Sequence, residues 1–415
     1  DFNEVVNEDL NLYAKWEENE KVKVVFHSNG GSKIEDVNIF VGKQINKPTE
    51  PIKENYKFVG WYTDKELTKE YDFNEVVNED LNLYAKWEEV KRDKNNKQNN
   101  NSKNNEKRNK DNNIDTIIIA NGEKYTDVLT STVLGNKIKS PILLVRKNYI
   151  DESTKKEIKR LNPKNIIISG GKSSVSLNVE NYLINRGHNI ERIYGKDRYE
   201  TSYNIAKKIY ENSKIKEKLT LVDGTSFPDI ITISSLSSIK KSPILLVKPN
   251  NLDNKTIDII KEISPKDIII GGGENSVSKN TEEFLKNFYN VKRFGGKDRY
   301  ETASIISEEV RKLTKNKENL ILVDGNNFPD GITINTLAYK FNSPIHLTQS
   351  NKLNDFTKKH INDYNIKSIL IGGGEASISE DIERYLKIKN IKTKRISGKD
   401  RYKTAVKISE KFTEK

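Results

Sequence analysis

A five-residue block, Gly-Lys-Asp-Arg-Tyr, occurs three times at a spacing of about 101 residues, and this spacing constrains the fold more than any other feature. The copies lie at Gly195–Tyr199, Gly296–Tyr300 and Gly398–Tyr402. A Ser-Pro-Ile block and a glycine-rich turn return with the same period. Self-similarity at a fixed period indicates a repeated supersecondary unit. The sequence therefore predicts three tandem modules, at residues 114–213, 214–315 and 316–415.

Each module alternates strand-like and helix-like segments. In the first copy, Thr116–Ala120, Ile142–Val145 and Ile166–Ser169 are continuous apolar runs, which are typical of strands buried on both faces. Helix-length amphipathic segments, such as Asp151–Leu161, lie between them. This alternation predicts an α/β fold class, with an open, mainly parallel, Rossmann-like sheet in each module.

A different repeat opens the chain. Residues 1–18 recur unchanged at 72–89, an offset of 71 residues, so we expect 1–18 to be the tail of one truncated repeat and 19–89 to be a complete copy. Short alternating or aromatic runs, such as Lys21–Phe26 and Leu81–Trp87, predict a mainly β structure.

Charge is distributed unevenly along the chain. Residues 1–89 carry 11 Lys/Arg against 20 Asp/Glu, a net charge of −9, whereas residues 114–415 carry 53 against 37, a net charge of +16. Residues 90–113, rich in Lys and Asn, offer little to bury and are predicted to be a disordered linker; a basic arm that grips a polyanion is the alternative. The basic C-terminal part favours a polyanionic partner, unless it reflects a general Lys- and Asn-rich bias.

Several classes of site find no support in the sequence. There is no Cys, and the four His residues do not lie at metal-ligand spacing, so we expect no metal site, no cofactor and no thiol chemistry. No apolar run approaches the roughly 20 residues of a membrane-spanning helix, so no membrane insertion is expected. The chain starts at Asp1 and contains no Met, which is expected of a fragment or a processed product.

The glycine turn follows the third strand, where a phosphate-binding loop would lie. It lacks the full glycine pattern of such loops, and we interpret Gly171, Gly272 and Gly373 as turn formers, with nucleotide binding as the alternative. The Ser residues that follow, Ser176, Ser278 and Ser379, are predicted helix N-caps. Acidic residues after the first strand, Asp127, Asp229 and Asp330, are interpreted as turn formers and helix caps, with Mg²⁺ binding as the alternative.

The Gly-Lys-Asp-Arg-Tyr block predicts a helix start. Asp197, Asp298 and Asp400 are expected to be N-caps, and Glu200 and Glu301 complete a capping box that Lys403 lacks in the third copy. Arg198, Arg299 and Arg401 then lie in the first helical turn, where the helix dipole disfavours cations. Two kinds of partner would offset this cost: a carboxylate across a module interface, or an anionic ligand bound together with Lys196, Lys297 and Lys399.

Two family resemblances rest on these motifs. VVFHSNGG, FVGWYTD and LNLYAKW resemble the Listeria–Bacteroides repeat, also called the internalin B-repeat, which implies a β-grasp-like surface stalk. GKDRYET, DGxxFPD, SPILLV and IIGGGExS resemble the clostridial cell-wall-binding repeat of type 2 over about 300 residues. That family implies Rossmann- or toprim-like modules with pseudo-threefold symmetry and non-covalent attachment to an anionic wall polymer.

The first module departs from this pattern. Tyr125–Asp127 replaces Phe-Pro-Asp, and no Gly-Lys-Asp-Arg-Tyr block precedes its first strand. The C-terminal block, Gly398–Tyr402, is expected to take that place and to close a ring of three.

The sequence thus favours a non-enzymatic, secreted wall anchor. Its expected partner is an anionic, teichoic-acid-like wall polymer or peptidoglycan, with other surface proteins as further partners of the stalk. One alternative is the targeting region of a cell-wall amidase or protease whose catalytic domain lies outside this chain. The other is a nucleic-acid binder, against which no helix-turn-helix, zinc finger or aromatic RNA platform is found.

Overall fold

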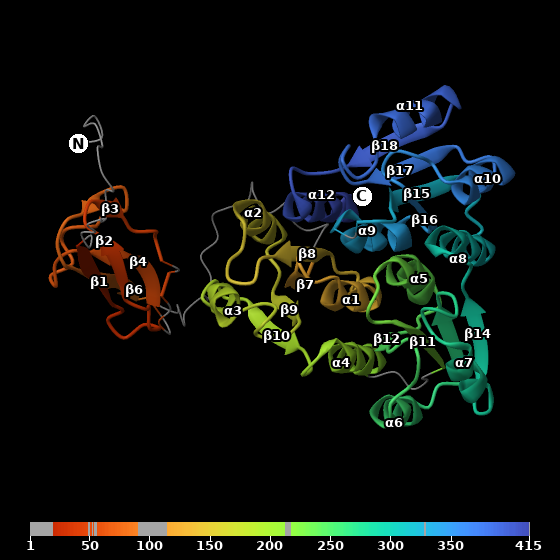
Figure 1. The fold of residues 1–415 in the computed structure, drawn as a ribbon, viewed down its shortest axis with the longest axis horizontal. Helices are drawn as coiled ribbons and strands as arrows, with labels where there is room; N and C mark the ends of the chain where they lie inside the picture. The colour runs from red at the N-terminus through yellow and green to blue at the C-terminus, as the bar shows by residue number, and fades with distance from the viewer. Residues whose placement is uncertain are drawn as a thin grey trace, which may run out of the picture. The chain divides into compact units, whose positions relative to one another are not determined.

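The chain forms two compact units, one within residues 1–99 and one within residues 100–415 (Figure 1). The computed structural model describes residues 20–48, 50–51, 53, 56–89, 114–211, 217–327 and 329–414, with the side chains of Lys57, Pro329, Asp330 and Ile332 excepted. The truncated repeat predicted at 1–18 and the linker predicted at 90–113 lie outside the described residues.

The N-terminal unit is a small β structure. Its strands are β1 (Lys21–His27), β2 (Val37–Phe40), β3 (Lys43–Gln44), β4 (Tyr56–Tyr62), β5 (Val76–Val77) and β6 (Leu81–Glu89). The main sheet has the order β2-β1-β6-β4, with β1 and β6 parallel and both outer pairs antiparallel. Trp61, only 1 % exposed, meets Phe26 and Phe58 edge-on in its core. The described part of 20–89 contains no helix, which confirms the mainly β prediction.

The C-terminal unit contains three modules with the same succession of elements. The first module comprises β7 (Thr116–Asn121), α1 (Tyr125–Lys137), β8 (Ile142–Val145), α2 (Glu152–Leu161), β9 (Asn165–Ser169), α3 (Leu177–Ile184), β10 (Asn189–Ile193) and α4 (Arg198–Tyr210). The second comprises β11 (Lys218–Asp223), α5 (Pro228–Ile239), β12 (Ile244–Val247), α6 (Asn254–Ile263), β13 (Asp267–Gly271), α7 (Lys279–Lys286), β14 (Asn290–Phe294) and α8 (Arg299–Thr314). The third comprises β15 (Asn319–Asp324), α9 (Pro329–Lys340), β16 (Ile345–Thr348), α10 (Asp355–Asp363), β17 (Ser368–Gly372), α11 (Glu380–Ile388), β18 (Lys392–Ile396) and α12 (Arg401–Thr413).

Each module is built on one four-stranded parallel sheet. The orders are β10-β9-β7-β8, β12-β11-β13-β14 and β16-β15-β17-β18, so the first strand of each module is central. All strand pairs in these sheets are parallel. The α/β class with parallel sheets, predicted from the unbroken apolar runs, is confirmed.

The central strands are buried on both faces because successive side chains enter two different cores. Ile117 and Ile119 of β7 point into an outer core that α2 and α3 cover. Ile118 and Ala120, the alternate residues, point into an inner core with α1. The inner core is continuous through all three modules, whereas each module has its own outer core.

The middle of the unit is formed by α1, α5 and α9, which pack against one another (Figure 1). Close approach is helped by Gly331, where a Cβ atom would lie 2.8 Å from Ile231 Cδ1. A buried polar contact also crosses this centre: Asn136 Nδ2 on α1 donates to Ser238 Oγ on α5 at 2.8 Å.

The last helix of each module bridges to the next one. Helix α4 packs on α1 and on β12, and α8 packs on α5 and on β16. Helix α12 packs on α9 and returns to β8 and α2 of the first module. The C-terminal block therefore takes the place that the first module lacks, and the ring predicted from the sequence is closed.

Candidate functional site

The Gly-Lys-Asp-Arg-Tyr blocks start the three bridging helices. Asp197 is the N-cap of α4 and accepts a hydrogen bond from the Glu200 N–H at 2.9 Å, while the Glu200 carboxylate accepts one from the Lys196 N–H at 2.9 Å. Gly195 has to be a glycine, because a Cβ there would lie 2.4 Å from Glu200 Cβ. Its N–H donates to Thr201 Oγ1 at 3.0 Å. These contacts determine where α4 begins and hold the backbone that leads into it.

The other two blocks repeat this arrangement with one difference. Asp298 caps α8 by accepting from the Tyr300 and Glu301 N–H groups, and Glu301 accepts from the Lys297 N–H at 2.7 Å. Asp400 caps α12 by accepting from the Lys403 N–H at 2.8 Å, but the reciprocal carboxylate is absent because residue 403 is Lys.

Each block arginine contacts the following module. Nη1 of Arg198 donates to the Gly224 carbonyl at 2.7 Å, and Nη1 of Arg299 donates to the Gly325 carbonyl at 2.5 Å. The contact made by Arg401 is with Gly122 of the first module, at 2.7 Å. The partner across each interface is a backbone carbonyl oxygen, whereas a carboxylate or an anionic ligand was expected from the sequence. Such a charge-assisted bond offsets the unfavourable dipole position.

The block tyrosines explain the glycine that ends each first strand. A Cβ on Gly224 would lie 2.9 Å from Tyr199 Cε1. The same 2.9 Å approach is made by Tyr300 to Gly325 and by Tyr402 to Gly122. At every joint between modules, an Arg and the Tyr next to it thus contact the glycine turn of the neighbouring module: the Arg by a hydrogen bond and the Tyr by packing.

The glycine turns and the acidic residues after the first strands form a buried contact. Gly170 (φ +110°), Gly272 (φ +104°) and Gly373 (φ +109°) adopt the left-handed conformation, so in the first module the special position is Gly170, one residue before the predicted Gly171. Cβ atoms at Gly170 and Gly272 would lie 2.5 and 2.3 Å from carboxylate oxygens of Asp127 and Asp229. Glycine here makes room for these carboxylates as well as for the turn.

Asp127 and Asp229 are not helix caps, contrary to the prediction. The N-caps of α1 and α5 are Lys124 and Phe227, and the Asp carboxylates are buried inside the first turn. Asp127 accepts a hydrogen bond from Ser174 Oγ at 2.8 Å, and Asp229 accepts one from Ser276 Oγ. Burial raises the pKa of both carboxyl groups, and the serine hydroxyls oppose that rise. The side chain of Asp330 lies outside the described residues.

The predicted serine N-caps precede the third helix of each module, but only one of the three serines makes a capping hydrogen bond. Ser176, Ser278 and Ser379 are the N-cap residues of α3, α7 and α11. Ser278 accepts from the Thr281 N–H, whereas the buried hydroxyls of Ser176 and Ser379 have no hydrogen-bond partner among the described residues.

A second repeated arginine was missed in the sequence. Nη1 of Arg192 donates to the Gly170 carbonyl at 2.8 Å, and Nε and Nη2 donate to the Glu180 carboxylate. Arg293 and Arg395 hold the other glycine turns in the same way, paired with Glu282 and Glu383. An Arg three residues before each Gly-Lys-Asp was the available signal.

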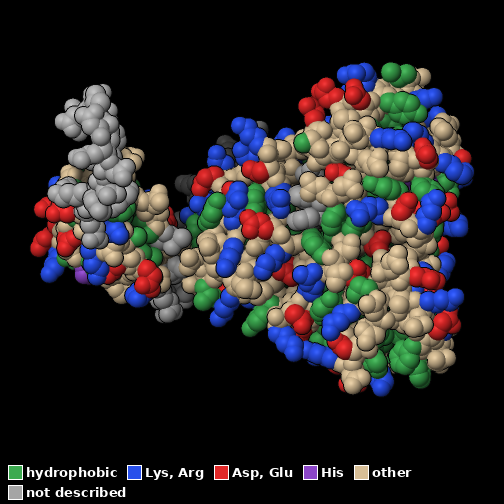
Figure 2. All heavy atoms as spheres, viewed as in Figure 1, with side chains coloured by type: hydrophobic (Ala, Val, Ile, Leu, Met, Phe, Trp, Pro, Cys, Tyr) green, Lys and Arg blue, Asp and Glu red, His purple; other side chains and the backbone are tan. Residues whose placement is uncertain are grey.

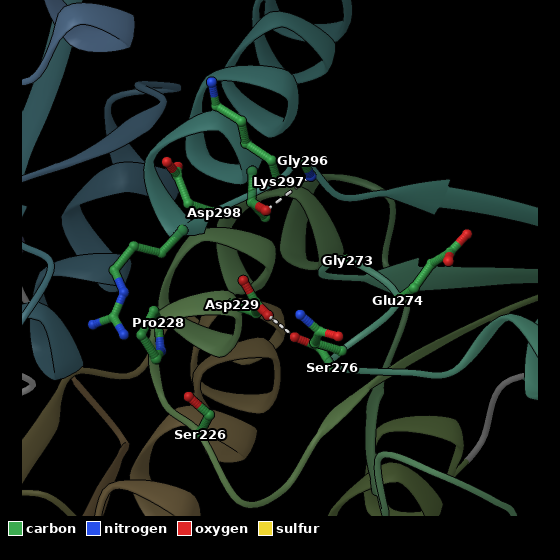
Figure 3. Close-up of a pocket in the computed structure, with 12 residues that line it drawn as sticks. Ser226, Pro228, Asp229, Gly273, Glu274, Ser276, Gly296, Lys297 and Asp298 are labelled. Carbon is green, nitrogen blue, oxygen red and sulfur yellow. Dashed lines mark hydrogen bonds between the residues drawn. The ribbon is translucent and has the colours of Figure 1, made fainter.

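These elements enclose equivalent clefts at the carboxyl edge of the sheets. In the second module the cleft has a volume of about 460 Å³ and is lined by Asp229, Ser276, Lys297 and Arg299, among others. Figure 3 shows Asp229 and Ser276 pointing toward one another, with Glu274 directed away from them. In the first module the cleft, about 330 Å³, is lined by Lys124, Asp127, Ser174, Lys196 and Arg198, among others.

Comparison with known proteins assigns the repeats. The model of cell wall binding domain 2 matches residues 92–180, 192–282 and 293–383, and that of the Listeria-Bacteroides repeat domain matches residues 23–86. The chain belongs to the cell wall binding domain 2 family. Its three repeats form a cell-wall-binding region, and the predicted order of one B-type repeat followed by three wall-binding repeats is confirmed.

Two relatives of the chain are an amidase enhancer and an amidase. The chain is 31% identical over 275 residues to the amidase enhancer of Bacillus subtilis, covering 66% of this chain and 37% of the relative. It is 28% identical over 272 residues to the N-acetylmuramoyl-L-alanine amidase LytC of the same organism, covering 66% and 53%. The chain thus spans about half or less of these relatives.

Solved structures show the same fold for the wall-binding part. Cwp8 from Clostridium difficile matches with a TM-score of 0.54 at 26% identity, covering 74% of this chain and 49% of that one. Cwp6 from the same organism matches with a TM-score of 0.56 at 24% identity, covering 71% and 44%. Within the described residues, no helix has the length and apolar character that a membrane span requires, and no cluster of three His, Asp or Glu side chains could hold a metal ion.

Proposed function

We propose that residues 114–415 anchor an exported surface protein to the cell wall non-covalently, by binding an anionic, teichoic-acid-like polymer in the repeated clefts, and that this region acts without catalysis. The observation that carries this proposal is the lysine of each Gly-Lys-Asp-Arg-Tyr block. Lys196, Lys297 and Lys399 are exposed in all three copies.

Every other side chain of the block has a task inside the protein. The Asp caps the helix, the Arg reaches a carbonyl of the next module and the Tyr packs on its glycine turn. The ammonium groups of the three lysines form no hydrogen bond or ion pair with any described residue; that of Lys297 lies 5.1 Å from the Phe356 ring centroid. They are therefore available to neutralise a phosphate or carboxylate of a polymer.

The clefts combine a cation with hydrogen-bond acceptors, and an anionic glycan can interact with both. Lysine supplies the cation, and the Asp carboxylate and Ser hydroxyl beside it can accept hydrogen bonds from sugar hydroxyl groups. Repetition matters because a polymer that occupies one cleft finds the next at high effective concentration. Figure 2 shows Lys and Arg spread over the visible face of the modules rather than gathered in one patch, which suits several weak sites.

We also propose a fold relationship for each of the two kinds of repeat. A central first strand in a parallel four-stranded sheet supports Rossmann- or toprim-like modules. The mixed sheet β2-β1-β6-β4, with its parallel central pair, supports a β-grasp-like N-terminal repeat. That repeat, acidic where the modules are basic, would be displayed as a stalk and would meet other surface proteins.

A second candidate function follows from the relatives. Similarity to an amidase enhancer and to an amidase favours a targeting region that brings a wall hydrolase, carried elsewhere in a longer protein, to its substrate. Wall lysis by the whole chain, followed as a fall in turbidity, would contradict the absence of catalysis proposed for it. A nucleic-acid binder is the remaining alternative, and competition of DNA with walls in a pull-down would expose it.

The decisive experiment is co-sedimentation with purified Gram-positive walls, before and after the anionic polymer is stripped. We expect residues 114–415 to sediment and residues 1–89 to remain in solution, with loss of binding to stripped walls. Binding should weaken as salt rises, since the Debye length is only about 8 Å at physiological ionic strength. Affinity carried by residues 1–89 would refute the domain assignment, and salt-independent binding would indicate a neutral glycan or peptidoglycan.

A further inference from the structure

The three joints of the ring share one geometry but differ in chemistry, first of all at the end of the bridging helix. Tyr210, Arg311 and Thr413 are equivalent, each twelve residues after the block arginine at the end of a bridging helix. Tyr210 enters the apolar outer core of the second module, which also contains Ile259. At the joint between the third and first modules, Thr413 accepts a hydrogen bond from Arg160, which is paired with the buried Glu157. The joint between the second and third modules contains Arg311.

Arg311 is a buried guanidinium that no carboxylate among the described residues pairs with. It is 4 % exposed, and its Nε donates to His360 Nε2 of α10 at 2.7 Å. Nη1 and Nη2 donate to the backbone carbonyls of Asn316 and Asn319 at 2.8 and 3.0 Å. The guanidinium carbon lies 4.9 Å from the centroid of the Tyr364 ring. These three hydrogen bonds of Arg311 thus all go to neutral acceptors.

A second histidine completes the cluster. His346 of β16 is fully buried, and its ring centroid lies 4.2 Å from that of His360. Its Nδ1 lies 3.2 Å from Thr357 Oγ1, while its Nε2 is buried without a hydrogen-bond partner among the described residues. Asp363 and Lys359 on α10 also act on the charge of His360, with opposite signs.

This geometry requires both imidazoles to be neutral. His360 Nε2 accepts the Arg311 hydrogen bond, so a proton added there would oppose the Arg311 N–H and place a second cation beside a buried one. Burial, and then Arg311, lower the pKa of His360 to about 3. Burial and the neighbouring His360 and Arg311 hold the pKa of His346 well below its ordinary value of 6.5. Burial lowers the pKa of Arg311 to about 10, so it stays charged at neutral pH.

We propose that the joint between the second and third modules is an acid-sensitive latch of the ring: protonation of His346 and His360 beside Arg311 opens it, while the other two joints stay closed. Those two joints lack the histidines, because Leu143 and Leu245 stand at the position of His346, and Glu157 and Ile259 at that of His360. The surface protein would then loosen its anchor in an acidified environment.

The direction follows from proton linkage. Each histidine takes up a proton more readily in the open joint than in the closed one, so the closed state is fully favoured above pH 6.5. Below that pH the closed-to-open ratio falls about tenfold per pH unit for each histidine, and for His360 this continues down to about pH 3. Between pH 7 and pH 5 we expect at least a tenfold increase in opening.

Amide hydrogen exchange on the whole chain at pH 7 and pH 5, corrected for intrinsic rates, tests the latch. We expect the end of α8, β16 and α10 to lose at least tenfold in protection at pH 5, and the end of α4, β12 and α6 to keep theirs. Equal protection at both pH values in all of these segments, or an equal loss at every joint, would overturn the proposal.

A matched variant takes its residues from the neighbouring joint. Arg311→Tyr combined with His346→Leu and His360→Ile installs the set Tyr210, Leu245 and Ile259 that serves between the first two modules. We expect this variant to lose the pH dependence; an unchanged pH dependence would refute the latch. If the triple variant does not fold, His346→Leu alone should reduce the pH dependence by about one proton, and an unaltered slope would again refute it.

Discussion

Nη1 of Arg401, in the last helix of the chain, donates a hydrogen bond at 2.7 Å to the carbonyl oxygen of Gly122, 279 residues earlier. Tyr402 packs on the same glycine. Arg198 and Arg299 make the equivalent hydrogen bonds between consecutive modules, and Arg401 makes this one between the last module and the first. The wall-binding region is therefore a closed ring in which the third module supplies the joint to the first, rather than a string of independent domains.

Arg401→Lys should lower the melting temperature by a few degrees. Loss of a charge-assisted hydrogen bond costs about 1–3 kcal/mol, and the shorter, non-planar ammonium cannot reproduce the guanidinium contact. Calorimetry measures the effect, with Lys399→Ala two residues away as the control that leaves melting unchanged. Equivalent Arg→Lys changes at 198 and 299 should cost a similar amount, and secondary loss of wall binding should accompany them. A variant with all three changes that melts and binds like the parent would show that these arginines contribute to neither stability nor wall binding.

Replacement of Lys196, Lys297 and Lys399 by Ala should weaken wall binding without a change in melting, because all three side chains are exposed and those of Lys196 and Lys297 line clefts. The matched control removes three other exposed lysines, Lys159, Lys261 and Lys392, which lie toward the amino edge of the sheets. Co-sedimentation with walls at several salt concentrations compares the cleft variant with the control variant. The cleft variant should show a shallower salt dependence, and equal loss in both variants would indicate a diffuse electrostatic effect instead of a site.

Asp127→Asn and Asp229→Asn should stabilise the fold at pH 7 while weakening wall binding. Burial raises the pKa of both carboxyl groups, so the folded state disfavours their charged form. With a folded pKa above the unfolded one, stability decreases as pH rises between the two values, and Asn removes that decrease. Melting curves from pH 3 to pH 7 should therefore be flatter for the double variant. A destabilised variant would show that the Ser174 and Ser276 hydroxyls bind the ionised form strongly.

Trp61→Ala should unfold the N-terminal unit and leave the wall-binding ring intact. The indole is 1 % exposed at the centre of a small core, and truncation of a buried Trp costs about 3–5 kcal/mol. Near-ultraviolet circular dichroism and calorimetry should show loss of one transition only. Phe40→Ala, at a side chain 44 % exposed in the same unit, is the neutral control.

Local chemistry explains why much of this fold was predictable. Strands such as Ile142–Val145 are apolar at every position because the sheet is covered on both faces, and the Asp197 cap follows from a pattern of four residues. Even ring closure could be inferred, because the first module lacks a block that the last one supplies.

Other contacts could not be predicted because they join residues whose neighbours are set only by packing. Asp127 resembles a helix cap in the sequence, yet its carboxylate turns inward to Ser174, 47 residues away. Arg192 resembles a surface residue of a strand edge, but it holds the Gly170 carbonyl. The pairing of Arg311 with His360 likewise depends on two modules meeting, and nothing in either segment alone indicates it.

Ile408→Ala should cost as much stability as Ile205→Ala and Ile306→Ala, although Ile408 lies in the last helix of the third module. The three isoleucines are equivalent, each seven residues after the block arginine, and each is 1 % exposed in the inner core that runs through all modules. Truncation of such a side chain costs about 2–5 kcal/mol. Urea unfolding should show three similar midpoints and one shared transition, because a loss at any joint opens the common core. A terminal helix that merely frays would lose far less at Ile408, and a separate early transition in that variant would show that the ring does not unfold as one unit.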